Sequence, residues 1–175
     1  MEKKEYFMSL RKLVPQDMEY YLEEKAAEGY MLKPIGQMGL FYFVFEETKP
    51  QKCKYVVDST SLPKELYLEM LDKKGWEMLG TIANFYICRK TYTDERPENF
   101  TDKPSRKKHC SVIGIIFMIV AFLCLFLAAG SIYGIYLENQ VGVDTHLVLY
   151  IVQTVIQIPF IAYFFMMGRK LLQAK

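Results

Sequence analysis

Residues 112–137 read VIGIIFMIVAFLCLFLAAGSIYGIYL, a stretch of 26 residues without a charged side chain. A helix rises about 1.5 Å per residue, so this stretch can cross the ~30 Å hydrocarbon core of a bilayer with some tilt. A second uncharged run, residues 147–167, contains 21 residues and fits the same core. Two such runs in succession predict a hairpin of two membrane-spanning helices within residues 111–168.

The cations around the two runs predict the orientation of the hairpin. Basic residues precede the first run and follow the second, whereas the connecting loop has neither lysine nor arginine. Because positively charged flanks stay on the cytoplasmic side, we expect a multi-pass protein of the plasma membrane with both termini in the cytoplasm. These cations are also expected to contact lipid head groups at the membrane surface. They are Arg106, Lys107, Lys108, Arg169 and Lys170.

Small and polar side chains within the hairpin indicate where its helices pack. Two glycines four residues apart let helix backbones approach closely, and two glutamines four residues apart share a helix face on which each amide needs a partner. Packing of the hairpin on itself, self-association and a transport path all stay open, although two helices without an intramembrane charge do not build a transporter alone. The residues are Gly130, Gly134, Gln153 and Gln157.

The charge of residues 1–102 argues against a nucleic-acid partner. This part of the chain carries 15 lysine and arginine residues against 18 acidic residues. Binding to nucleic acid needs a basic face that neutralises phosphates. The excess of positive charge lies instead at residues 103–108, at the end of a polar linker that we expect over residues 92–110.

The sequence offers no set of residues for metal binding or catalysis. The four cysteines form no Cys-x-x-Cys pair, and neither histidine lies at ligand spacing from them. The two histidines, His109 and His146, fall on opposite sides of the bilayer in the predicted topology. The chain has no phosphate-binding loop and no nucleophile motif. We therefore expect no metal, no cofactor and no enzymatic activity.

An internal repeat predicts the fold of residues 1–91. Residues 21–30 read YLEEKAAEGY and residues 67–76 read YLEMLDKKGW, so each unit has a helix that ends at glycine and is followed by an aromatic residue. Pro15 and Pro63 stand at the starts of the helices, where a missing N–H costs nothing. With one strand before each helix and two after it, the pattern predicts a duplicated βαββ unit in a ferredoxin-like, two-layer α+β sandwich.

Aromatic residues are dense in this part of the chain. Residues 40–45 are apolar on both faces of the predicted strand, whereas a strand with one covered face should alternate. Burial against a partner, an intradomain core and a pocket for a small apolar ligand remain three alternatives. The candidate binding surface consists of Tyr30, Phe41, Phe43, Phe45, Trp76 and Tyr86.

Several motifs together resemble the family called domain of unknown function 2812. They include the helix end EKAAEGYML, the strand FYFVFEE, and the shorter segments KYVVD, GWE and YICRK, at residues 24–32, 41–47, 54–58, 75–77 and 86–90. The resemblance covers about residues 5–91. It implies a protein of Gram-positive bacteria with membrane helices after the domain, often encoded beside PadR-like repressors, and with no established activity.

These features lead to one expected function and one alternative. We expect a membrane-anchored, non-enzymatic regulatory or sensor module whose cytoplasmic domain binds a protein or a small apolar effector. Its partners would be the lipid bilayer and a protein, which includes a second copy of the chain. The alternative is an accessory subunit of a transporter or another membrane complex, with the hairpin as the contact surface.

Overall fold

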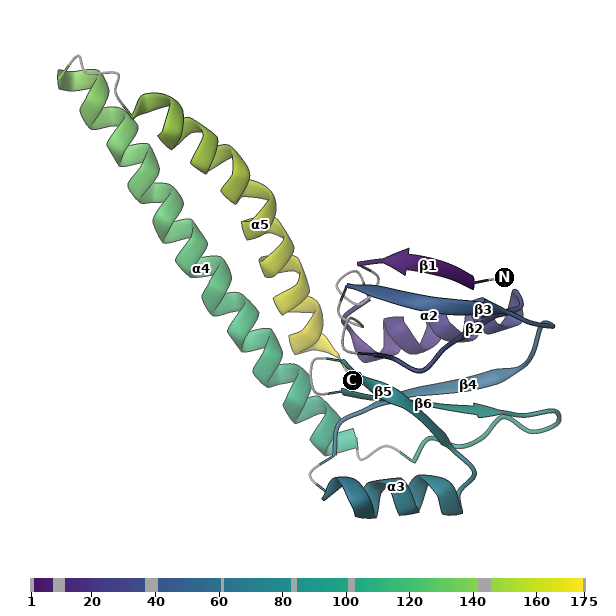
Figure 1. The fold of residues 1–175 in the computed structure, drawn as a ribbon. Helices are drawn as coiled ribbons and strands as arrows, with labels where there is room; N and C mark the ends of the chain where they lie inside the picture. Colours follow the sequence, from purple (N-terminus) through teal and green to yellow (C-terminus); the bar gives the residue numbers. More distant parts are fainter. Residues whose placement is uncertain are drawn as a thin grey trace. The chain divides into compact units, whose positions relative to one another are not determined.

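The computed structural model describes residues 2–7, 12–36, 41–60, 62–82, 85–100, 103–141 and 146–174. The chain divides into two units. The first comprises residues 1–109 with the last two residues, and the second comprises residues 110–173 (Figure 1). The first unit contains small sheets and helices, and the second consists of two long helices. We describe each unit by itself.

The first unit has the expected α+β composition. Its strands form two three-stranded antiparallel sheets with the orders β1-β3-β2 and β4-β6-β5. The expected single ferredoxin-like sheet is therefore not what the described residues form. The elements are β1 (Glu2–Tyr6), α2 (Pro15–Ala27), β2 (Tyr30–Leu32), β3 (Tyr42–Glu47), β4 (Cys53–Asp58), α3 (Lys64–Lys73), β5 (Glu77–Ile82) and β6 (Phe85–Thr91).

The two sheets stay separate because β2 is short. After Lys33 the chain reaches Pro34, which has no N–H to donate to a neighbouring strand. One backbone hydrogen bond then joins the two sheets, from Ile35 N to Leu79 O at 2.6 Å. This approach requires glycine at position 80, because a Cβ there would lie 2.8 Å from Cβ of Ile35.

Both helices of the first unit form where the sequence predicts them. The apolar stripe of α2 is buried, and it comprises Met18, Tyr21, Leu22 and Ala26. In α3, Tyr67 and Leu71 are buried against Val56 and Cys88 of the second sheet, whereas Leu66 is 54% exposed. Figure 1 shows α3 on the side of the second sheet that faces away from α2.

The apolar strand β3 alternates between a buried and a partly exposed face. Phe43 and Phe45 are each 1% exposed, and Tyr21 of α2 packs edge-on against Phe45 with ring centroids 6.3 Å apart. Tyr42, which precedes Phe43, and Val44, which lies between the two phenylalanines, are partly exposed. The intradomain core therefore accounts for Phe43 and Phe45, and these two residues do not belong to an exposed binding surface.

Replacing Gly29 with alanine is expected to destabilise the first unit by about 2 kcal/mol, because an L residue is disfavoured in left-handed backbone and the new methyl would collide with the chain. Gly29 has a φ of 90° and its added Cβ would lie 2.8 Å from the carbonyl oxygen of Thr48. Thermal unfolding followed by Trp76 fluorescence measures the change. Gly36→Ala is the control, because nothing lies within 4 Å of a Cβ there. Equal stability of both variants would contradict the prediction.

The second unit contains most of α4 (Lys103–Val141) and α5 (Leu147–Gln173). Both helices are long and apolar enough to cross a membrane, with mean hydropathies of 3.1 and 1.9 in their most apolar windows. Large apolar side chains are exposed along them, for example Phe126 at 76% and Val148 at 71%. A helix in the core of a soluble protein would bury such side chains, so these features indicate a membrane protein.

The first long helix starts earlier than the sequence pattern predicts. The apolar run predicts helix from about residue 112 to residue 137, but α4 runs from Lys103 to Val141. The basic residues at 106–108 are therefore helical and not part of a flexible linker. Lysine and arginine have high helix propensity, so a charged stretch extends an apolar helix at little cost.

The helices of the hairpin approach each other at a glycine pair that the sequence pattern did not reveal. A Cβ on Gly114 would lie 3.1 Å from the carbonyl oxygen of Gly168, and the reverse distance is also 3.1 Å. Of the four predicted packing residues, Gly134 lies against the ring of Tyr150, and Gln157 is partly buried. A Cβ added at Gly130 would meet nothing within 4 Å, and Gln153 is exposed, so neither packs within the hairpin.

Candidate functional site

The segment that leads from β6 to α4 packs on the first unit, although its polar composition predicts a free linker. Tyr92 N donates a hydrogen bond to Lys52 O at 3.0 Å, and Arg96 donates to Glu23 at 2.6 Å. Phe100 lies against Trp76, with ring centroids 4.8 Å apart. Residues 92–100 are thus part of the domain surface.

Two carboxylates of α2 accept hydrogen bonds from backbone N–H groups at the edge of β4. Glu19 and Glu23 are one helical turn apart, and they accept hydrogen bonds from the backbone N–H groups of Val57 at 2.8 Å and Tyr55 at 3.3 Å. Lys54 Nζ lies 3.1 Å from Glu23. Unpaired N–H groups at a sheet edge invite pairing with another strand, and these side chains prevent it.

Arg106, in the second turn of α4, binds one of these carboxylates. Its two terminal nitrogens donate to the two oxygens of Glu19 at 2.8 and 3.4 Å. Both side chains are buried, with 9% and 10% exposed. Burial raises the pKa of Glu19 above its ordinary value, although Arg106 and the Val57 N–H act in the opposite direction.

The ion pair changes the expected role of the basic cluster. Arg106 was predicted to contact lipid head groups, but its guanidinium is occupied by Glu19 and shielded from solvent. Lys107 and Lys108 are exposed, as are Arg169 and Lys170. For these four residues, contact with the membrane surface stays a prediction.

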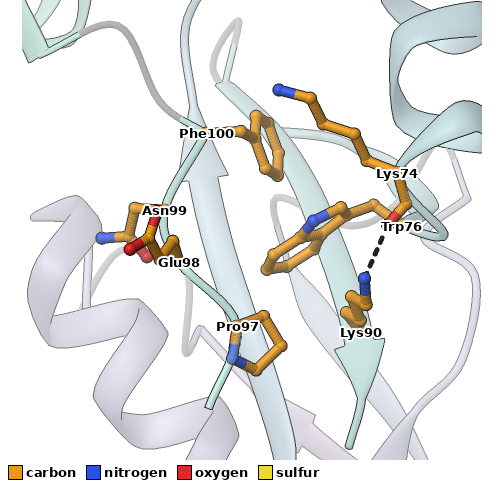
Figure 2. A pocket seen from close by; sticks show the side chains of 7 residues that line it. All are labelled: Lys74, Trp76, Lys90, Pro97, Glu98, Asn99 and Phe100. Carbon is orange, nitrogen blue, oxygen red and sulfur yellow. Dashed lines mark hydrogen bonds between the residues drawn. The ribbon is translucent and has the colours of Figure 1, made fainter. Parts of the chain in front are cut away.

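A pocket of about 370 Å³ lies where this segment meets the second sheet. Figure 2 shows Trp76 between Phe100 and Lys90, with Pro97 beside it. Lys90 Nζ donates a hydrogen bond to Lys74 O at 2.6 Å, which holds the lysine along one wall. The lining residues are Lys74, Trp76, Lys90, Pro97, Glu98, Asn99 and Phe100.

The end of α3 fixes the position of Trp76. Gly75 has a φ of 67°, and Trp76 N then donates to Leu71 O at 2.9 Å, which closes the helix end. One side of the indole joins a buried cluster with Val56, Tyr67, Leu71 and Cys88. Trp76 is only 6% exposed, so it forms a rigid floor for the pocket.

The same cluster contains polar groups that burial makes unreactive. Tyr67 donates a hydrogen bond to Asp58 at 2.9 Å. Burial raises the pKa of Tyr67 and raises the pKa of the Cys88 thiol to about 12. A protonated, fully buried thiol is a poor nucleophile, so nothing here marks Cys88 as reactive.

Comparison with known proteins assigns the chain to a family. A family model described as a protein of unknown function, DUF2812, matches residues 15–122, which is more than half of the chain. The chain belongs to this family. No curated protein and no solved structure is significantly similar to it. The predicted family is thus confirmed, and the match extends beyond the expected residue 91.

The matched region of this DUF2812 protein includes the whole pocket. It begins at the first residue of α2, continues through residues 92–102 and ends within α4. The segment whose composition predicts a linker is therefore part of the family pattern. The roles of Phe100, Lys74, Lys90 and Glu19 were not predicted, because only their distant partners reveal them.

The six predicted surface aromatics of this DUF2812 protein do not form one surface. Phe43 and Phe45 are core residues of the first sheet, and Phe41 is 45% exposed. Tyr30 is partly exposed, with the ammonium group of Lys3 5.2 Å from its ring centroid. Trp76 and Tyr86 lie in the second sheet region, where Tyr86 packs on Tyr67 with centroids 4.9 Å apart.

Metal binding finds no support within the part of the chain that the structure describes. No group of three or more histidine, cysteine, aspartate or glutamate side chains there could hold an ion. The pocket around Trp76 presents aromatic rings and lysines, which suit recognition of an organic molecule. We therefore take this pocket as the candidate functional site.

Proposed function

We propose that this DUF2812 protein is a membrane-anchored, non-enzymatic regulatory module whose first unit binds a small effector or a protein partner. We also propose that both termini face the cytoplasm, as the cation distribution suggests. One observation supports the regulatory role above the others. The pocket has one wall from the turn after α3 and from β6, and another wall from residues 97–100, which precede α4.

Because residues 97–100 line the pocket and precede α4, ligand binding could be coupled to the position of this segment. A ligand shifts a conformational equilibrium only by the difference of its affinities for the two states. Phe100 is a wall of the pocket, so any displacement of residues 97–100 changes the contacts that a ligand can make. The pairs Arg96–Glu23 and Arg106–Glu19 hold the flanks of this segment and set the cost of displacing it.

The arrangement of the sheets supports a duplicated βαββ unit. A strand, a helix and two strands occur twice in order, and in each sheet the first strand pairs with the third. Residues 97–100 follow the second copy and pack against Trp76, which is at the position of Tyr30 in the first copy. We propose that duplication supplied the scaffold and that this added segment gave one copy a binding site.

An accessory subunit is the second candidate function. Gly130 has open space around it and Gln153 is exposed on an otherwise apolar helix surface. Small residues allow close helix approach and an amide in lipid favours a hydrogen-bonding partner. These features support contact between the hairpin and another membrane protein.

Two matched variants distinguish the two functions. Phe100→Ala removes a pocket wall, and Gly130→Leu fills open space on the hairpin without a clash inside it. Full-length protein is released gently from its own host membrane, and native mass spectrometry identifies bound small molecules and proteins. The regulatory module predicts that Phe100→Ala loses the bound molecule by at least about tenfold, which corresponds to about 1.4 kcal/mol, whereas Gly130→Leu retains it.

The opposite pattern would support the accessory subunit. A partner protein lost in Gly130→Leu and retained in Phe100→Ala places the contact on the hairpin. Equal recovery of every bound species in both variants would contradict both functions. Circular dichroism of each variant checks that its helices and sheets are retained.

A further inference from the structure

The pocket around Trp76 presents hydrogen-bond donors on an aromatic base. The indole N–H of Trp76 has no hydrogen-bond partner among the described residues, and its ring lies edge-on to Phe100 at an interplanar angle of 71°. Indole and phenyl faces favour a flat apolar group. If a ligand covered the indole N–H without accepting its hydrogen bond, the free energy of binding would be less favourable. A ligand that fills the pocket therefore needs an acceptor near this N–H.

Two ammonium groups give the pocket its charge. Lys74 and Lys90 both line it, and neither forms an ion pair within the described part of the chain. Lys90 uses one of its three N–H donors on the backbone oxygen of Lys74 and keeps two. Figure 2 shows the carboxylate of Glu98 on the far side of the 97–100 backbone from Trp76. Glu98 and Asn99 nevertheless line the pocket, so its charged groups are two ammonium groups and one carboxylate, with positive charge in excess.

Cations, neutral apolar molecules and large ligands fit this arrangement less well than a small anion does. A cation would gain from the aromatic faces but would meet two like charges at short range. A neutral apolar molecule would remove water from the lysines and the indole N–H without replacing its hydrogen bonds. The volume of about 370 Å³ is at the lower end of the range for small-molecule pockets and suits a small ligand.

We propose that the pocket formed by Lys74, Trp76, Lys90 and Phe100 binds a small organic anion, with its planar apolar part against the two rings and its carboxylate or sulfonate on the lysines. This proposal rests on the proposed regulatory function and names the chemical class of its effector. It replaces the small apolar effector expected from the sequence by a charged one. The anion would contact both walls of the pocket, and so would favour the packed position of residues 97–100.

Trp76 provides a direct readout because it is the single tryptophan of the chain. Full-length protein in detergent micelles is titrated with benzoate, benzyl alcohol and benzylammonium, which share one ring and differ in charge. Benzoate is expected to change the fluorescence of Trp76 saturably, with an affinity at least about tenfold above that of benzyl alcohol, because its carboxylate forms charge-assisted hydrogen bonds with the lysines. Benzylammonium is expected to give no saturable change.

Two neighbouring lysines make a matched pair of variants. Lys74→Gln is expected to weaken benzoate binding about tenfold, because it removes one cation from the pocket but retains the backbone oxygen that Lys90 uses. Lys73→Gln makes the same change one residue earlier, at a side chain that is 78% exposed and outside the pocket, and should bind benzoate like the wild type. Equal affinities of the two variants, or equal binding of all three probes, would overturn the proposal.

The two proposals fail in different ways. If benzoate does not bind but Phe100→Ala still loses a molecule that copurifies with the wild type, the ligand class is wrong and the regulatory function stands. If benzoate binds through Lys74 while no copurifying species depends on Phe100, the anion site stands and the regulatory function is wrong.

Discussion

Replacing Arg106 with methionine is expected to destabilise the first unit by about 3 kcal/mol, because it leaves the buried carboxylate of Glu19 without its cation. Glu19 keeps the hydrogen bond from Val57 N and the more distant charge of Lys54. These contacts place the expected cost at the lower end of the range for broken buried pairs. Urea unfolding of the full-length protein in detergent micelles, followed by the fluorescence of Trp76, measures it.

Two further variants test the cause of this loss. Lys107→Met removes the neighbouring exposed cation and is expected to change the free energy of unfolding by less than about 0.5 kcal/mol. The double variant Glu19→Met with Arg106→Met replaces the whole pair by apolar groups. It is expected to lie within about 1 kcal/mol of the wild type, because burial makes the charged pair costly and only the Val57 N–H loses a partner. A double variant less stable than Arg106→Met alone would contradict this account.

Replacing Phe45 with alanine is expected to destabilise the first unit by about 4 kcal/mol, the usual cost of removing a buried phenyl ring. Phe45 is 1% exposed, and it packs against Tyr21 and Phe43 with ring centroids 6.3 Å away in both contacts. The cavity left by the ring has rigid walls in α2 and the first sheet. The same urea unfolding experiment measures the loss.

Phe41→Ala is the matched control because Phe41 directly precedes the same strand and is 45% exposed. It is expected to cost less than about 1 kcal/mol. Comparable losses for the two variants would show that Phe45 is not a core residue. The contrast also has a practical consequence, since replacing Phe43 and Phe45 by polar residues would unfold the sheet and could not report on a binding surface.

Local patterns predicted the secondary structure of the first unit well but not its sheet arrangement. Pro15 and Gly29 mark the ends of α2, and Gly75 marks the end of α3, because proline and glycine act through their own backbone geometry. Whether two groups of strands merge into one sheet depends on the pairing of β2 with β5. Pro34 has no N–H for that pairing, and Gly80 allows only the local approach of Ile35 to Leu79. Neither effect can be read from the spacing of apolar residues.

The candidate site was only partly predictable. The sequence predicted Trp76 as a binding residue because this large aromatic residue follows the glycine that ends α3. Its place at the base of a pocket depends on Phe100, which is 24 residues farther along the chain. Residues 92–100 resemble a linker because they are polar and contain proline. Composition alone does not reveal that the segment packs on the domain through Tyr92, Arg96 and Phe100, because their partners are distant in the chain.

The two apolar helices, the α+β composition of the domain and the family were all predictable from the sequence, because each follows from residues that are close together in the chain. Hydropathy over a run, helix stops and spaced motifs need no knowledge of distant partners. The core position of Phe43 and Phe45 and the pairing of Arg106 with Glu19 across 87 residues became visible only in the three-dimensional arrangement. The two members of a buried ion pair are brought together by folding, so no local sequence pattern reveals which residues pair. The apolar stretch at residues 112–137 therefore predicted a long apolar helix correctly, but not that this helix begins at Lys103, within the first unit, where Arg106 pairs with Glu19.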